Sequence, residues 1–228
     1  LLSNGLFVDV SSLSSGWLLT GNSILSTDFL GSTNNQPLNF KVNNTQAGKI
    51  DSISKTLLGY QAGLNDLSSV GTTAMGYQAL KSNSTGTENS AFGHSALFTN
   101  IIGVDNAAFG GFSMYFATGD KNSAFGHRSL NALTTGTLNT AVGAQSGAGL
   151  TTGSYNTFLG VNTTASLVSV NKSVVIGYNA IVSANNNVVI GGTGADAVSV
   201  VVGDTEADAS ALVDLISSEK GLLIPRVT

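Results

Sequence analysis

The stretch TGTENSAFGHSAL, residues 85–97, decides the fold because its pattern returns along most of the chain. Two later copies read TGTLNTAVGAQSG at 135–147 and TGSYNTFLGVNTT at 152–164. When the copies are aligned on the glycine that follows the apolar residues, successive glycines are 17, 17, 17, 16, 17, 17, 17, 14 and 12 residues apart. A period of this length indicates a repeat architecture. The ten repeat glycines are Gly59, Gly76, Gly93, Gly110, Gly126, Gly143, Gly160, Gly177, Gly191 and Gly203.

Each repeat has its own internal order. An asparagine stands four residues before the repeat glycine in many copies, and a second glycine stands seven residues before it in five. The unit therefore reads as a Thr-Gly turn, a short strand and a second short extended piece. A recurring glycine marks a close backbone approach or a positive φ. Asparagine tolerates a left-handed conformation and can bond its own backbone or the asparagine one coil away. We therefore interpret both columns as structural rather than ligand-binding.

A helical repeat is the competing interpretation, and it fails on energy. Each glycine inside a helix costs about 1 kcal/mol, and most units hold at least two glycines besides several Ser, Thr and Asn. A unit of this length suits one coil of an all-β parallel β-roll, whose coils stack at roughly 4.8 Å. The repeats predict about ten coils, and hence a rod roughly 45–50 Å long.

Three regions follow from the extent of the repeat. Residues 51–203 are expected to form the stacked coils, and residues 204–228 a connector that continues further. Residues 1–50 lack the repeat and contain Pro37, so we expect a separate β-rich cap or connector there, covering the open end of the coils. The chain begins Leu1-Leu2-Ser3 without a leader pattern, as expected of a fragment or a processed product.

The composition excludes several classes of function. Only 10% of the 228 residues are charged while 42% are hydrophobic, which argues for a folded β-rich chain rather than a disordered one. The net charge is −4 without any cluster of Lys or Arg, so nucleic-acid binding is not expected. There is no cysteine, and no apolar run approaches the ~18 residues that span a bilayer. We expect no cofactor and no membrane insertion.

The strand of each coil is apolar at two consecutive positions before the glycine. Consecutive strand residues point to opposite faces, so such a strand is expected to be buried on both sides. One face fills the coil, and the other requires a partner, for which a copy of the same chain around a symmetry axis is the economical choice. The sequence leaves open which column faces the axis. The candidates for the core and the trimer interface are Phe92, Phe109, Phe125, Ala91, Ala108, Ala124 and Ala141.

The three quoted stretches resemble the head repeats of trimeric autotransporter adhesins, over roughly residues 52–203. The resemblance implies left-handed parallel β-rolls wound as homotrimers. The flanks at 16–44 and 207–228 resemble segments that bracket such repeats in phage tail fibres and related bacterial surface proteins. Many of those proteins continue into a C-terminal intramolecular chaperone, and this sequence contains neither that domain nor the autotransporter's membrane anchor.

Few residues suggest chemistry. His94 and His127 follow repeat glycines two coils apart, roughly 9–10 Å along the axis, which is too far for one metal ion. A ring of one histidine from each subunit around a trimer axis is the metal-binding alternative, and solvent-facing turn residues are the simpler interpretation. The sole tryptophan, Trp17, is expected in packing. The exposed aromatic candidates for holding sugars are Tyr60, Tyr77, Tyr115, Phe116 and Tyr155.

The acidic residues show no catalytic pattern, although a glycosidase would need two carboxyl groups roughly 5–9.5 Å apart. They are Asp51, Asp66, Glu88, Asp105, Asp120, Asp196, Asp204, Glu206, Asp208, Asp214 and Glu219. We therefore expect no enzyme and no catalytic or metal-binding residue. The sequence predicts an extracellular homotrimeric fibre module that attaches to a surface glycan or protein receptor, as a phage tail fibre in the first place. A bacterial surface adhesin, a purely structural filament and a glycan-degrading tailspike are the alternatives, in that order.

Overall fold

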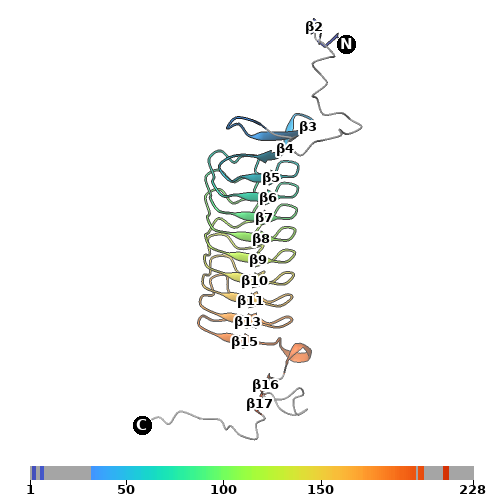
Figure 1. Ribbon diagram of the computed structural model, residues 1–228. Coiled ribbons are helices and arrows are strands. Elements are labelled where there is room, and N and C mark those ends of the chain that lie inside the picture. The colour runs from blue at the N-terminus through green and yellow to red at the C-terminus, as the bar shows by residue number, and fades with distance from the viewer. Residues whose placement is uncertain (1, 4–5, 8–31, 199, 203–212, 216–228) are drawn as a thin grey trace. The chain divides into compact units, whose positions relative to one another are not determined.

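A computed structural model describes residues 2–3, 6–7, 32–198, 200–202 and 213–215. The chain divides into two compact units, residues 1–34 and 35–228. In the first unit, β1 (Leu2–Ser3) pairs antiparallel with β2 (Leu6–Phe7). The second unit contains the repeats, which stack one above the other (Figure 1).

The repeats form a parallel β-solenoid, as the period predicts. Neighbouring strands pair in parallel with equivalent residues opposite each other, so that Ala108 lies beside Ala124 and Phe109 beside Phe125. The stack makes about eight turns, and the described part of the chain contains no α-helix. Its strands are β5 (Thr56–Leu58), β6 (Thr73–Met75), β7 (Ser90–Phe92), β8 (Ala107–Phe109), β9 (Ser123–Phe125), β10 (Thr140–Val142), β11 (Thr157–Leu159), β13 (Val174–Ile176) and β15 (Val188–Ile190).

The second half of most coils is a stack of turns rather than the second extended piece that we expected. Only β12 (Thr164–Ala165) and β14 (Ile181–Val182) form a second pair of parallel strands. Elsewhere, two positions of this half are left-handed in each coil, as at Gln78 and Leu80, which an extended strand does not allow. The turns still bond from coil to coil: the Gln78 N–H donates to the Tyr60 carbonyl of the preceding coil, and the Leu80 N–H donates to the Ala96 carbonyl of the next.

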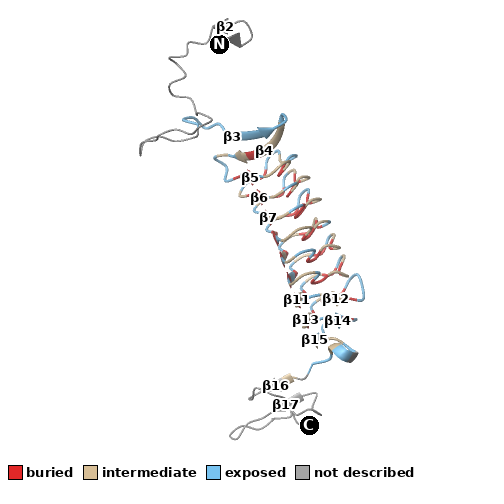
Figure 2. Ribbon diagram, turned by 90° about the vertical axis from the view of Figure 1, so that its right-hand side faces the viewer, coloured by how far each residue is buried: buried red, intermediate tan, exposed pale blue. Residues whose placement is uncertain are grey.

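Buried residues recur at the same place in successive coils, as the colouring of Figure 2 shows. Their side chains fill the interior of the solenoid. From Leu57 to Val189, the residue two before the repeat glycine points inward, and the turns of most coils supply larger apolar side chains against it. Where the inward strand residue is large, the turn residue that faces it is small. Phe158 and Leu57 are the bulky members of the strand column, and Gly147 and Gly63 stand where other coils place leucine or methionine. A Cβ at Gly147 would lie 3.2 Å from the Phe158 ring, so the two positions share one volume.

A ladder of buried asparagines runs through the coils. The Oδ1 atom of Asn122 accepts hydrogen bonds from the backbone N–H of Asn139, at 3.0 Å, and from its Nδ2, at 3.1 Å. Asn122 Nδ2 in turn donates to the carbonyl of Gly136 at 2.9 Å. The asparagines themselves are not left-handed. The residue before each of them takes that conformation, for example Glu88, with φ of 57°.

The repeat glycines stack from Gly59 to Gly191, with positive φ at each. A Cβ on Gly126 would lie 2.4 Å from the carbonyl oxygen of Gly143, a separation that atoms cannot reach without moving the backbone. The glycines seven residues earlier are equally crowded, since a Cβ on Gly136 would lie 2.2 Å from the oxygen of Gly153. Gly203 lies outside the described residues.

At the N-terminal end of the sheet, β3 (Leu38–Val42) and β4 (Thr45–Ile50) form an antiparallel hairpin. β4 then pairs antiparallel with β5, so the hairpin occupies the edge of the first coil. An unpaired edge would offer its N–H and C=O groups to other chains.

At the C-terminal end the stack stops earlier than the ten glycines predict. β16 (Val200–Val202) pairs with β17 (Val213–Leu215) instead of adding a coil beside β15. A short 3-10 turn, Gly194–Asp196, follows β15, and the Gly192 N–H bonds the Asp196 carbonyl at 2.9 Å. Val198 then lies against Gly191, where the next glycine of the column would have to stack. Among the described residues, no helix is long and apolar enough to cross a membrane.

Candidate binding surfaces

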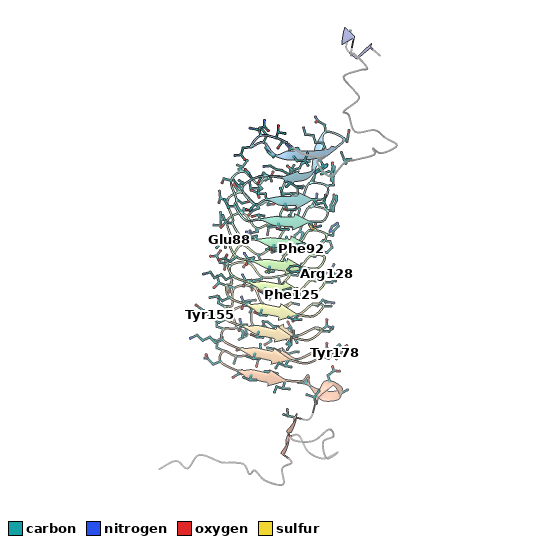
Figure 3. All side chains as sticks on the ribbon, in the orientation of Figure 1. Glu88, Phe92, Phe125, Arg128, Tyr155 and Tyr178 are labelled. Atoms are coloured by element: carbon teal, nitrogen blue, oxygen red, sulfur yellow. The ribbon has the colours of Figure 1, made fainter. Side chains whose placement is uncertain are left out.

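From Leu58 to Ile190, the residue just before the repeat glycine points out of the solenoid, opposite to the core. These residues form a continuous line along the outer face of the sheet, and most remain between a third and a half exposed. The rings of Phe92, Phe109 and Phe125 stack from coil to coil, with centroids 4.7 and 5.0 Å apart. Phe92 and Phe125 lie over the strands in Figure 3. We call this line the apolar stripe; it comprises Leu58, Met75, Phe92, Phe109, Phe125, Val142, Leu159, Ile176 and Ile190.

The structure resolves which column of the strand faces outward. Ala91, Ala108, Ala124 and Ala141 are fully buried inside their own chain. These alanines therefore belong to the core and cannot meet another subunit. Of the interface candidates from the sequence, only Phe92, Phe109 and Phe125 are on the outer face.

One side of the solenoid, where the chain leaves the strands, carries aromatic rings in contact. We call this side the exit edge; it comprises the first seven residues after each repeat glycine, and Figure 3 labels Arg128 and Tyr178 on it. Tyr60 stacks on Tyr77 with centroids 6.1 Å apart, and Tyr77 stacks on His94 at 4.9 Å. Two of the sugar-holding candidates from the sequence, Tyr60 and Tyr77, are thus neighbours.

Tyr115 and Phe116 lie further along the same edge, at the coil that follows Gly110. Tyr115 stacks on Phe98, with centroids 4.9 Å apart and planes 3° apart, and Phe116 meets Tyr115 edge-on. Tyr155, the remaining candidate, lies on the opposite side (Figure 3). The sequence could not show this division, because it depends on where the turns fall between strands.

The two histidines do not form a metal site with each other. His94 and His127 are exposed on the exit edge, and the ring of Phe112 contacts both, at 4.8 and 6.3 Å between centroids. Within the described residues, no group of three His, Cys, Asp or Glu side chains could hold a metal ion.

Several of the carboxylates have structural partners. The Asp66 side chain is buried and pairs with Lys55, whose Nζ lies 3.0 Å from Asp66 Oδ1. It also accepts a hydrogen bond from the Ser69 N–H. Asp120 accepts a hydrogen bond from the N–H of Val104 at 2.9 Å. Asp196 accepts one from the Asn179 side chain at 2.8 Å. Sequence reasoning missed the Lys55–Asp66 pair, since its members stand eleven positions apart and no repeat position marks them.

Glu88 and Asp105 occupy the same place in adjacent coils, five residues before the repeat glycine, and both are exposed. We call the side that holds this column the entry edge; Glu88 and Tyr155 mark it in Figure 3. Its members are left-handed whatever their side chain, and they include Lys121 and Leu138. Trp17 and the acidic residues 204, 206, 208 and 219 lie outside the described residues.

Comparisons of the chain with models of protein families, with curated proteins and with solved structures found no match.

Proposed function

We propose that this chain is a subunit of an extracellular homotrimeric fibre that acts by attachment and without catalysis, in the first place as part of a phage tail fibre. One observation carries the proposal, namely the apolar stripe along the whole parallel sheet. Monomeric proteins rarely expose an apolar patch of this extent, and such patches mark interaction sites. A sheet face with stacked phenylalanines in register offers a regular surface to an identical face.

The number of three copies follows from the resemblance of the repeats to trimeric β-roll heads. Solenoids also suit the fibre role physically, because each coil contacts only its neighbours and the length grows by adding units. The carboxylates that bind backbone or lysine groups favour a structural rather than a catalytic use of the acidic residues. The residues with no such structural role, such as Glu88 and Asp105, are the ones a tailspike glycosidase would have to use.

The oligomeric state is tested by sedimentation equilibrium of the chain at micromolar concentration. We expect a mass three times that of the 23.1 kDa chain. A stable monomer would contradict the trimer and with it the fibre. Release of reducing ends from a bacterial polysaccharide by the purified chain would favour the tailspike instead.

Immunogold electron microscopy with antibodies against the chain tests whether it occurs on virions or on cells. Label at the tails of released virions is expected for a tail fibre. Label on the surface of uninfected cells would instead favour a bacterial adhesin. Label confined to the cell interior would contradict an extracellular role of either kind.

A further inference from the structure

The exit edge carries an aromatic cluster that the fold does not require. The cluster consists of Tyr77, His94, Phe98, Phe112, Tyr115 and His127. Its rings touch in a continuous series across four coils: His94 contacts Tyr77 and Phe112, and Tyr115 contacts Phe98 and Phe112. Tyr77, His94 and His127 are exposed, and the other three rings are half-buried.

The next coil shows that the solenoid forms without these rings. After Gly143, the equivalent positions hold Ala144, Gln145 and Ala148. That coil keeps its strand pairing, and the Gln145 N–H still donates to the His127 carbonyl at 2.9 Å. Aromatic side chains that the architecture can replace by alanine, and that stay accessible to solvent, are available for binding.

The charged side chains beside the cluster are positive. Lys81 Nζ lies 5.7 Å from the centre of the Phe98 ring, and Arg128 Cζ lies 5.8 Å from that of Phe112. The four turn segments 77–83, 94–100, 111–117 and 127–133 contain no Asp or Glu. In the same coils Glu88 and Asp105 are on the entry edge. A ligand of the cluster therefore has an apolar face for the rings and a negative charge for the cations.

We propose that the aromatic cluster binds an acidic oligosaccharide that lies along the coils. The C–H groups of a sugar ring pack against the exposed edges of the stacked rings, and its carboxylate or sulfate accepts hydrogen bonds from Arg128 and Lys81. The ring-to-ring series runs from coil to coil, which suits a linear chain of sugars. This inference rests on the proposed attachment function, since it names the class of ligand that the fibre would hold.

The experiment uses the whole chain on a glycan array that carries uronic-acid, sialic-acid and sulfated oligosaccharides together with their neutral counterparts. We expect binding to acidic members that weakens as the salt concentration rises, because charge contributes to it. Tyr77→Ala and Arg128→Gln are expected to weaken that binding at least tenfold. Binding to neutral glycans only, or to none, would overturn the proposal.

Two controls separate the cluster from aromatic side chains in general. Tyr178 occupies the same column as Tyr77 and is 56% exposed, against 45% for Tyr77, but it lies beyond the cluster. Tyr155 is 58% exposed on the entry edge. Tyr178→Ala and Tyr155→Ala should bind like the unaltered chain, and an equal loss in all three tyrosine variants would overturn the site.

Sedimentation of the same variants distinguishes this inference from the proposed function. Tyr77→Ala and Arg128→Gln should keep the mass of the unaltered protein, and a fall to monomers would make the exit edge a subunit interface and overturn the glycan site. A trimer that binds no acidic glycan refutes only this inference. A monomer that binds acidic glycans through Arg128 refutes the trimer and the fibre but leaves this binding site standing.

Discussion

The ring of Phe92 lies almost parallel to that of Phe109 one coil away, with centroids 4.7 Å apart and planes 7° apart. Both rings point out of the solenoid, so their stacking does not fill the core. The pair, continued by Phe125, presents a row of ring edges at the middle of the apolar stripe. Our first prediction tests what covers this surface.

Phe109→Glu or Phe125→Glu should give a folded monomer, because a trimer would bury like charges together at a cost of several kcal/mol. The measurement is sedimentation mass with circular dichroism to verify the fold. Leu138→Glu is the matched control, since Leu138 is 43% exposed and Phe125 is 41% exposed. Ala108→Glu should instead prevent folding, because Ala108 is inside the chain. Trimers that persist in both phenylalanine variants would show that the stripe is not the interface.

Gly126→Ala should destabilise the solenoid strongly, whereas Gly111→Ala should be tolerated. The added Cβ at Gly126 would meet the Gly143 oxygen at 2.4 Å, and the left-handed backbone adds about 1–2 kcal/mol. At Gly111 the nearest atoms are 3.5 and 4.0 Å away, which is ordinary contact. Thermal unfolding followed by circular dichroism compares the two, at about 2–4 °C per kcal/mol for a chain of this size. Equal melting temperatures would contradict the close stacking.

Asn122→Ala should lower the stability by several kcal/mol, because it removes the acceptor of the buried Asn139 N–H. An unsatisfied buried group costs about 1–3 kcal/mol, and the Gly136 carbonyl loses its donor as well. Asn131→Ala is the control, since that half-buried side chain makes a single bond to Phe112 O at 2.9 Å. Melting temperatures again give the comparison. A smaller effect at Asn122 than at Asn131 would mean that the ladder contributes little.

Asp66→Asn should destabilise the first coil by about 3–5 kcal/mol, since it leaves the Lys55 ammonium buried without its partner. Lys55 is 1% exposed, so water cannot replace the carboxylate. Lys55→Met with Asp66→Leu should restore much of the stability, because no charge then remains buried. Lys49→Met, which breaks the more exposed pair with Asp51 at 3.3 Å, should change the melting temperature little. Hydrogen exchange at residues 55–70 localises the effect.

Deleting residues 1–50 should leave a trimer that is less soluble, because β5 would lose its β4 partner and expose an edge. Deleting residues 1–34 keeps the β3–β4 hairpin and should preserve solubility. Sedimentation and light scattering measure both properties. Loss of trimers in the longer deletion would place the subunit contact in the N-terminal part rather than on the stripe.

The parallel solenoid could be predicted from the glycine interval, because stacking of identical positions requires a constant coil length. The end of the stack could not be predicted in this way. The VVVG copy at 200–203 fits the motif, but the 12-residue interval before Gly203 contains the turn at Gly194–Asp196, and Val198 lies against Gly191. The motif predicts a strand. A further coil of the solenoid also requires enough residues between that strand and the one before it.

The candidate surfaces were predicted only in part. The sequence shows two apolar columns in the strand. It does not show which of them faces the core, because both positions are apolar and their side chains point to opposite faces. The alanines proved to be the inner column because leucines from the turns fill the space opposite them. The contacts of Phe112 with both histidines needed the turn geometry, in which this phenylalanine is left-handed with φ of 57°.

The left-handed column of the entry edge holds an acid, a base, an aliphatic and an aromatic residue at Glu88, Lys121, Leu138 and Tyr155. Each of them donates its backbone N–H to the preceding coil, at 2.9 to 3.1 Å, so the hydrogen bonding is indifferent to the side chain. A single substitution in this column can therefore reverse the charge that one coil presents, at points about 4.8 Å apart along the edge, without disturbing the stacking of the coils. The molecule can diversify the surface of this edge one residue at a time while the scaffold stays constant.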